Sequence, residues 1–174
     1  MAGPERIVSL CPSITETLVA LGAGPRLVGV TRWCVRPRED LAAVERIGGT
    51  KTPDVARIAA LAPELVFANA EENREEDVRA LRDAGIEVDV TLPRTVAQVP
   101  GAIRQWGRAL EAQACAEELA RAIEESLEAL ASEPSLRPFR YAYWIWKDPW
   151  MTVSDDTYVA DLLRLAGGVN AYGG

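Results

Sequence analysis

The amino-acid sequence predicts an α/β fold: a Rossmann-like parallel sheet flanked by helices, then a long backbone helix, then the first strand and helix of an incomplete second α/β lobe. Two observations predict it. Short apolar runs alternate with helical segments over residues 6–90, at the lengths typical of βαβ units. From residue 100 to residue 131, apolar side chains recur mostly every three or four positions, which indicates one amphipathic helix. We therefore expect an N-terminal lobe at 1–99, the helix at 100–133 and a second-lobe fragment at 134–174.

The first lobe is expected to contain four buried parallel strands, which apolar runs place at 6–10, 27–30, 65–68 and 86–90. Ser13 and Glu16 have the spacing of a capping box, so Ser13 is expected to cap the first helix. A second helix is expected to begin with Pro53 at its first position, and a third to span 75–84. Residues 31–51 show neither the apolar period of a helix nor that of a strand, and they are expected to be irregular.

The helix over 100–133 is expected to be about 45 Å long at 1.5 Å per residue, which exceeds an ordinary crossover between two strands. The stretch YAYWIWKDPW at 141–150 concentrates aromatic residues within and after a strand expected over 139–146, and a helix is expected over 155–166. As the first strand of a second lobe, covered on both sides, residues 141–145 are expected to be core. WKDPW then follows at the carboxyl end of that strand.

Composition excludes several classes of function. The 174 residues carry a formal net charge of −7 and include no histidine. The negative charge argues against nucleic acid, whose phosphates require basic faces, and against a polybasic membrane patch. The lack of histidine removes the Ser-His and Cys-His nucleophile systems and the commonest metal ligand. No apolar run reaches the ~18 residues of a membrane span, and the N-terminus lacks the pattern of a signal peptide.

A nucleotide-dependent enzyme is the main catalytic alternative for a Rossmann-like lobe. Neither G-x-G-x-x-G nor G-x-x-x-x-G-K-[ST] occurs in the chain, so the usual phosphate-binding loops are missing. We therefore expect a non-catalytic protein that requires no cofactor and has no metal site of its own. Cys11 and Cys34 have three possible roles: a disulfide, a thiolate ligand to a metal centre, or buried inert thiols, of which we favour the last.

Three motifs carry a family resemblance: CPSITETLVALG at 11–22, GGTKTPDVARIAALAPELV at 48–66 and LLRLAGGVN at 162–170. They resemble the substrate-binding proteins of the helical-backbone (class III) ABC importers, which are receptors for cobalamin, haem and ferric siderophores, and they are most similar to the cobalamin branch. The resemblance covers residues 5–172. It implies two Rossmann-like lobes joined by one rigid helix, with a metal-chelate ligand in the cleft between them. A complete second lobe would need roughly another hundred residues.

The resemblance also implies partners and a location. The ligand is expected to be cobalamin, haem or a ferric siderophore, and the location periplasmic or extracytoplasmic. One glutamate on each lobe of such receptors meets arginines on the importer's membrane subunit, and Glu75 is the best match here, with Glu76 or Glu72 as alternatives. The competing interpretation is a truncated paralogue or interaction protein that forms a homodimer through its incomplete second lobe.

Ligands of open α/β sheets bind outside the carboxyl ends of the strands. Trp33 follows the second strand, and its ring either lies against a macrocycle or packs beneath its own loop. Asn69 and Asn73 either donate amide hydrogen bonds to a corrin rim or stabilise their turn. Ser13 is better explained as a helix cap, although the N–H groups of its helix would still face the ligand.

Trp146 and Trp150 are the expected contacts from the second lobe, where the two rings can flank a flat ligand. Arg32 and Arg94 either meet carboxylates or phosphates of a ligand or, the interpretation we favour, remain solvated at the surface.

Overall fold

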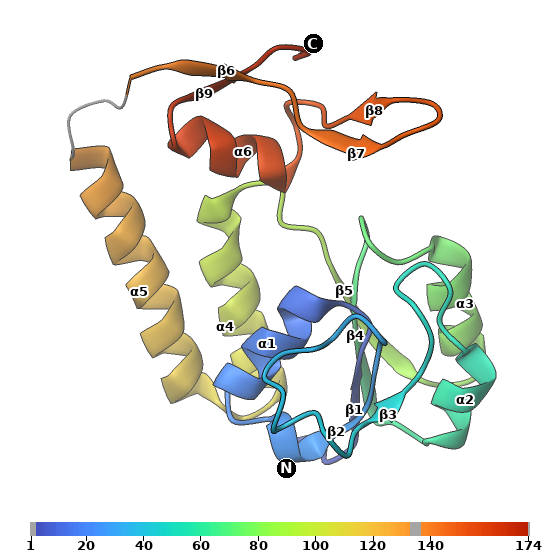
Figure 1. Ribbon diagram of the computed structural model, residues 1–174. Helices are drawn as coiled ribbons and strands as arrows, with labels where there is room; N and C mark the ends of the chain where they lie inside the picture. The colour runs from blue at the N-terminus through green and yellow to red at the C-terminus, as the bar shows by residue number, and fades with distance from the viewer. Residues whose placement is uncertain (1–2, 133–136, 174) are drawn as a thin grey trace. The chain divides into compact units, whose positions relative to one another are not determined.

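The computed structural model describes residues 3–132 and 137–173, and its chain forms two compact units (Figure 1). The first unit comprises Met1–Leu92 and Ile103–Glu118, and the second comprises Pro93–Ala102 and Leu119–Gly174. The chain therefore passes between the units three times.

The first unit is built on a five-stranded parallel sheet with the order β3-β2-β1-β4-β5. Its strands are β1 (Ile7–Ser9), β2 (Leu27–Val30), β3 (Glu45–Arg46), β4 (Leu65–Asn69) and β5 (Glu87–Thr91). Four of the five lie where the apolar runs predicted them. The fifth, β3, corrects the prediction that residues 31–51 are irregular: its two charged residues carry no apolar pattern, and pairing with β2 makes them a strand.

Helices cover both faces of this sheet, with α2 (Val55–Ala60) and α3 (Glu75–Asp83) on one side and α1 (Pro12–Ala20) on the other (Figure 1). A short 3₁₀ helix, η1 (Gly24–Arg26), leads into β2. One continuous apolar cluster lies between the sheet and the α2–α3 pair; its buried members are Val8, Leu10, Ile47, Ile58, Val66, Ala68, Val78, Leu81 and Val88.

Two helix starts differ from the prediction. Helix α1 begins at Pro12 with Cys11 at the N-cap position and no side-chain cap, so the predicted capping box is wrong. Proline fits the first helical position because its missing N–H would have no partner there, and this places Ser13 inside the first turn. Helix α2 begins after Pro53: Asp54 is the N-cap, and its carboxylate accepts the Arg57 N–H at 2.9 Å.

The single helix predicted over 100–133 is wrong, because the stretch forms two helices. A 3₁₀ turn, η2 (Val96–Gln98), leads into α4 (Val99–Ala109), and α5 (Gln113–Ser132) follows. The chain turns between them with Glu111 at φ 56°, in the left-handed region. Residues 133–136, where the helix was expected to end, lie outside the described residues.

In the second unit, the described residues that follow α5 form two small sheets and helix α6. Strand β6 (Phe139–Tyr141) pairs in parallel with β9 (Gly168–Asn170), and β7 (Trp144–Trp146) pairs antiparallel with β8 (Met151–Thr152). Helix α6 (Tyr158–Leu165) confirms the helix predicted over 155–166, with Thr157 as its N-cap. The single strand predicted over 139–146 is therefore wrong, since β6 and β7 belong to different sheets.

The expectation that residues 141–145 form core is also wrong for the described chain. Tyr141 is half-buried, whereas Trp144 and Ile145 are 48% and 50% exposed. Within residues 3–132 and 137–173, β7 pairs only with β8, and Trp144 packs only in part, against Trp150 and Tyr172.

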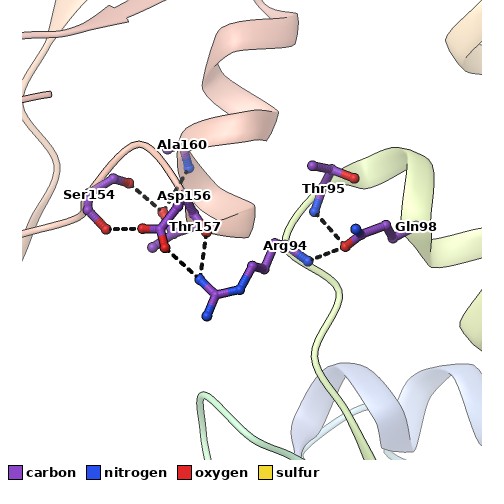
Figure 2. A network of polar contacts seen from close by, with 7 residues as sticks. All are labelled: Arg94, Thr95, Gln98, Ser154, Asp156, Thr157 and Ala160. Carbon is purple, nitrogen blue, oxygen red and sulfur yellow. Dashed lines mark hydrogen bonds and ion pairs between the residues drawn. The ribbon is translucent and has the colours of Figure 1, made fainter. Parts of the chain in front are cut away.

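A polar network ties the segment before α4 to the start of α6, both within the second unit (Figure 2). The Arg94 guanidinium donates to the Asp156 carboxylate at 2.8 Å and to the Asp156 carbonyl at 3.0 Å. Close by, the buried Asp161 carboxylate accepts the Val96 N–H at 2.8 Å and pairs with Arg164. Two backbone segments that are distant in the sequence are therefore joined through aspartates.

Replacing Asp161 with asparagine is expected to lower the free energy of unfolding by about 1–3 kcal/mol at neutral pH, since a hydrogen-bonded charge is lost. Burial raises the pKa of Asp161, but the hydrogen bonds from Arg164 and from the Val96 N–H outweigh it and leave the pKa below its usual value. A lowered folded-state pKa stabilises the protein above the unfolded-state pKa, and this contribution is lost as pH falls through the folded-state value.

The check is thermal unfolding between about pH 5 and about pH 3, where the midpoint should fall less in the Asp161→Asn variant than in the parent chain. Asp83→Asn, at the exposed end of α3, is the control that should keep the parent's pH dependence. If the Asp161→Asn variant and the parent show identical pH profiles, the Asp161 carboxylate does not have the stabilising role assigned to it.

Candidate functional site

A pocket of about 490 Å³ opens at the carboxyl ends of the first unit's strands. Its lining residues are Cys11, Pro12, Ser13, Trp33, Thr50 and Glu72. These residues come from the segments that follow β1, β2, β3 and β4, including the first turn of α1, in a parallel sheet where all four strands end at the same edge. This is the edge where open α/β sheets bind ligands, so the pocket is the candidate functional site.

The buried Asn73 side chain holds three of these loops together. Its Nδ2 donates to the Leu10 carbonyl at 3.2 Å and to the Thr50 carbonyl at 2.9 Å, while its Oδ1 accepts the Asn69 N–H at 2.8 Å. Each bond pairs the buried amide with a backbone group, as buried polar groups require. The Asn73 amide therefore makes structural hydrogen bonds, the alternative given above for this residue, and fixes the pocket wall.

Asn69 also stabilises its own turn, as its Oδ1 accepts the N–H groups of Glu71 at 2.8 Å and Glu72 at 3.1 Å. The turn carrying Thr50 is closed by a bridge between Gly48 and Pro53. Gly48 has φ 97°, and a Cβ there would lie 2.5 Å from the Thr52 carbonyl oxygen, so this turn requires glycine. The side chains of Asn69 and Asn73 thus shape the site, and direct contact with a ligand stays a prediction for both.

A buried polar cluster lies beneath the pocket. The Thr15 hydroxyl is 2.8 Å from the Ser9 hydroxyl and 3.1 Å from the Cys34 thiol, and Thr31 contacts the same thiol at 3.1 Å. Cys11 and Cys34 are both free thiols, so the disulfide alternative is wrong. Burial raises the pKa of the Cys11 thiol, which keeps it protonated and disfavours a thiolate ligand.

Trp33 is the only aromatic side chain of the pocket lining. It is 57% exposed, so its ring does not pack beneath its own loop. The Arg32 guanidinium lies 5.3 Å from the centre of the ring, close enough for a cation–π contact. Ser13 also lines the pocket, where its hydroxyl lies 3.3 Å from the Cys11 sulfur. The structure therefore brings Ser13 and Trp33 together.

Trp146 and Trp150 lie in the second unit, at either end of the β7–β8 turn, and each is 64% exposed. Trp150 packs against Trp144 with 5.4 Å between ring centres, and the Lys147 ammonium lies 5.9 Å from the Trp150 ring. Both tryptophans are open to solvent as a ligand contact requires. That they share a ligand with Trp33 stays a prediction, as does the homodimer.

Three other candidates are charged. Glu75 and Glu76 lie on the first turn of α3 with side chains 89% and 71% exposed, and their ion pairs with Arg79 and Arg74 are at the surface. Arg94 bonds to Asp156 and is not simply solvated, which corrects the interpretation favoured above (Figure 2).

Sequence reasoning missed Thr50 and Glu72 as lining residues. Thr50 follows β3, the strand without an apolar pattern, and Glu72 lies in the expected ligand loop after β4 but was not named as a ligand contact. The signal that could have found them is the spacing of the loops: each follows a strand of the same sheet by two to four residues. Within residues 3–132 and 137–173, no group of three metal-binding side chains comes together. No helix of these residues is long and apolar enough to span a membrane.

Comparison with known proteins agrees with this architecture. The family model described as "Periplasmic binding protein" matches residues 7–174. A vitamin B12-binding protein of Vibrio cholerae is 27% identical over 169 residues, which are 97% of this chain and 61% of the relative. One from Pectobacterium atrosepticum is 25% identical over 175 residues, covering 62% of its length. The chain thus spans about three fifths of the curated relatives it matches.

Two solved structures resemble the chain closely. The crystal structure of the periplasmic vitamin B12 binding protein BtuF of Vibrio cholerae superposes with a TM-score of 0.87 at 26% identity, covering 99% of this chain and 68% of that one. The periplasmic heme-binding protein RhuT from Roseiflexus sp. RS-1 gives a TM-score of 0.82 at 30% identity, covering 97% and 66%. With a family model that matches all but its first six residues and a fold shared with these structures, the chain belongs to the periplasmic binding protein family.

Proposed function

We propose that this protein is the non-catalytic substrate-binding component of an ABC importer that captures a metal chelate: cobalamin or a related corrinoid, haem or a ferric siderophore. The observation that carries the proposal is the pocket at the carboxyl ends of β1–β4, which combines the open Trp33 ring with small polar groups. An aromatic face buries apolar surface of a flat ligand, while hydroxyl and backbone groups orient its rim. The names of the relatives support this class of ligand.

The same proposal includes a partner and a location. Glu75 and Glu76 are proposed as the docking carboxylates for the importer's membrane subunit, because both are highly exposed and begin a helix of a rigid lobe. Their surface ion pairs with arginines of this chain contribute little energy and can be exchanged for arginines of a partner. The proposed location is the periplasm or another extracytoplasmic space.

The test of ligand capture is Trp33→Ala. This change is expected to weaken binding of the preferred ligand at least about tenfold, because a buried aromatic contact contributes on the order of 1.5–3 kcal/mol. Binding is measured by isothermal titration of the 174-residue chain with dicyanocobinamide, haemin and a ferric hydroxamate siderophore. Unfolding of the variant should stay within about 0.5 kcal/mol of the parent, since Trp33 is mostly exposed.

Val35→Ala provides the matched control, because Val35 is an exposed apolar residue of the same loop outside the pocket lining. It should bind as the parent does. If the parent chain binds none of the three ligands, or if Trp33→Ala binds as tightly as Val35→Ala, the proposed function is wrong for this pocket.

A further inference from the structure

Glu72 gives the pocket lining a carboxylate. It is the only acidic or basic residue of the lining. Its backbone N–H bonds to Asn69, so the residue's position is fixed, and its side chain is exposed. Among the described residues, no lysine or arginine forms an ion pair with the Glu72 carboxylate.

Arg74, two positions from Glu72, pairs with Glu76 and Asp77. The basic residues next to the lining residues Thr50 and Trp33 also have other contacts. The Lys51 ammonium donates to the Glu71 carbonyl at 2.5 Å, and the Arg32 guanidinium lies against the Trp33 ring. Burial is the main cause that raises the pKa of the Cys11 thiol, while local hydrogen bonds lower it. The negative charge of Glu72 also raises this pKa. A ligand in this pocket therefore faces the Glu72 carboxylate as well as the Trp33 ring.

We propose that Glu72 makes this pocket select chelates with a neutral, amide-bearing rim and reject those with carboxylate rims. This inference rests on the proposed function and narrows its ligand class to amidated corrinoids rather than haem. Amide N–H groups donate to a carboxylate, and such charge-assisted bonds are stronger than neutral ones. A haem propionate would instead place a second negative charge beside Glu72, in a pocket that supplies no basic lining residue.

A matched pair of ligands separates charge from shape. Dicyanocobinamide and dicyanocobyrinic acid share the corrin ring and the cobalt, but the second carries carboxylates where the first carries amides. Titrating the 174-residue chain with each at low salt should show tighter binding of dicyanocobinamide, and haemin serves as a further anionic ligand. Added salt should reduce the preference, because it screens exposed charges.

Glu72→Gln keeps the size of the side chain and removes its charge. It is expected to tighten binding of dicyanocobyrinic acid about fivefold or more while changing that of dicyanocobinamide less, a factor that corresponds to one charge pair at the surface. Glu72→Lys should tighten the binding of dicyanocobyrinic acid further. The control is Glu71→Gln, which removes an exposed neighbouring charge outside the lining and should keep the parent's preference.

The outcomes separate this inference from the proposed function. A parent chain that binds dicyanocobyrinic acid or haemin more tightly than dicyanocobinamide overturns the inference and leaves the proposed function standing. The inference is also wrong if Glu72→Gln keeps the parent's preference. A parent chain that binds none of these chelates, nor a ferric siderophore, overturns the proposed function and this inference together.

Discussion

Replacing Phe67 with alanine is expected to lower the free energy of unfolding by about 3–5 kcal/mol, which is the usual cost of removing a fully buried phenyl ring. Phe67 lies in the middle of β4, is fully buried and meets Trp106 edge-to-face at 6.2 Å between ring centres. Its strand pairs with β1 on one side and β5 on the other, so the sheet cannot readily collapse into the space left behind.

The measurement is urea unfolding followed by far-UV circular dichroism, since tryptophan fluorescence would respond to the altered surroundings of Trp106. Phe67→Leu retains most of the apolar volume, so it should lower the free energy of unfolding clearly less than Phe67→Ala does. Because whole domains are stable by only about 5–15 kcal/mol, the alanine variant should unfold at a much lower urea concentration. A Phe67→Ala variant as stable as the Phe67→Leu variant would show that Phe67 is not a central core residue.

Replacing Gly107 with alanine is expected to destabilise the protein by about 1–3 kcal/mol or more, although the same change inside most helices is stabilising. Gly107 lies in α4 where it crosses the start of α5, and a Cβ there would be 2.2 Å from the Ala116 Cβ. No rotamer change relieves a clash between two Cβ atoms, so the two helices would have to move apart.

Gly101 is the control within the same helix, because a Cβ at that position has no neighbour within 4 Å. Gly101→Ala should stabilise the protein by up to about 1 kcal/mol. The test is the midpoint temperature of thermal unfolding, which Gly107→Ala should lower and Gly101→Ala should raise. Adding Ala116→Gly to Gly107→Ala should restore part of the loss; a Gly107→Ala variant that is more stable than the parent would refute the close approach.

The parts of the fold that were predicted correctly are those where local pattern and tertiary environment agree. Strands β1, β2 and β4 are apolar runs that become buried inside the sheet. The edge strand β5 forms where predicted, but only Val88 of its residues is buried, which corrects the expectation of a buried strand there. The break at Glu111 was missed because Leu110 and Ala114 are four positions apart, so the apolar spacing continues through it in the sequence. In the structure Ala114 is exposed and Ala116 is buried instead. The turn at Glu111 brings Gly107 of α4 close to Ala116 of α5. No local sequence pattern predicts that contact between the two helices.

The site was predicted in part for a similar reason. The rule that ligands lie at the carboxyl ends of strands placed Ser13 and Trp33 correctly in one pocket. Thr50 and Glu72 join them only through β3 pairing and through the hydrogen bonds of Asn73, which connect residues up to 63 positions apart. Likewise, Tyr141 to Ile145 have the alternation of a core strand, but they divide between two small sheets and all except Tyr141 are exposed.

The hydrogen bonds of Asn73 have an evolutionary consequence. The groups that fix the loops are a buried amide and backbone carbonyls, whereas Trp33 and Glu72 face the pocket and bear none of that structural role through their side chains. Exchanging the ring or the carboxylate therefore alters what the pocket recognises without disturbing its frame. Under the proposed function, such a division would let one scaffold serve receptors for chemically different chelates through a few surface substitutions.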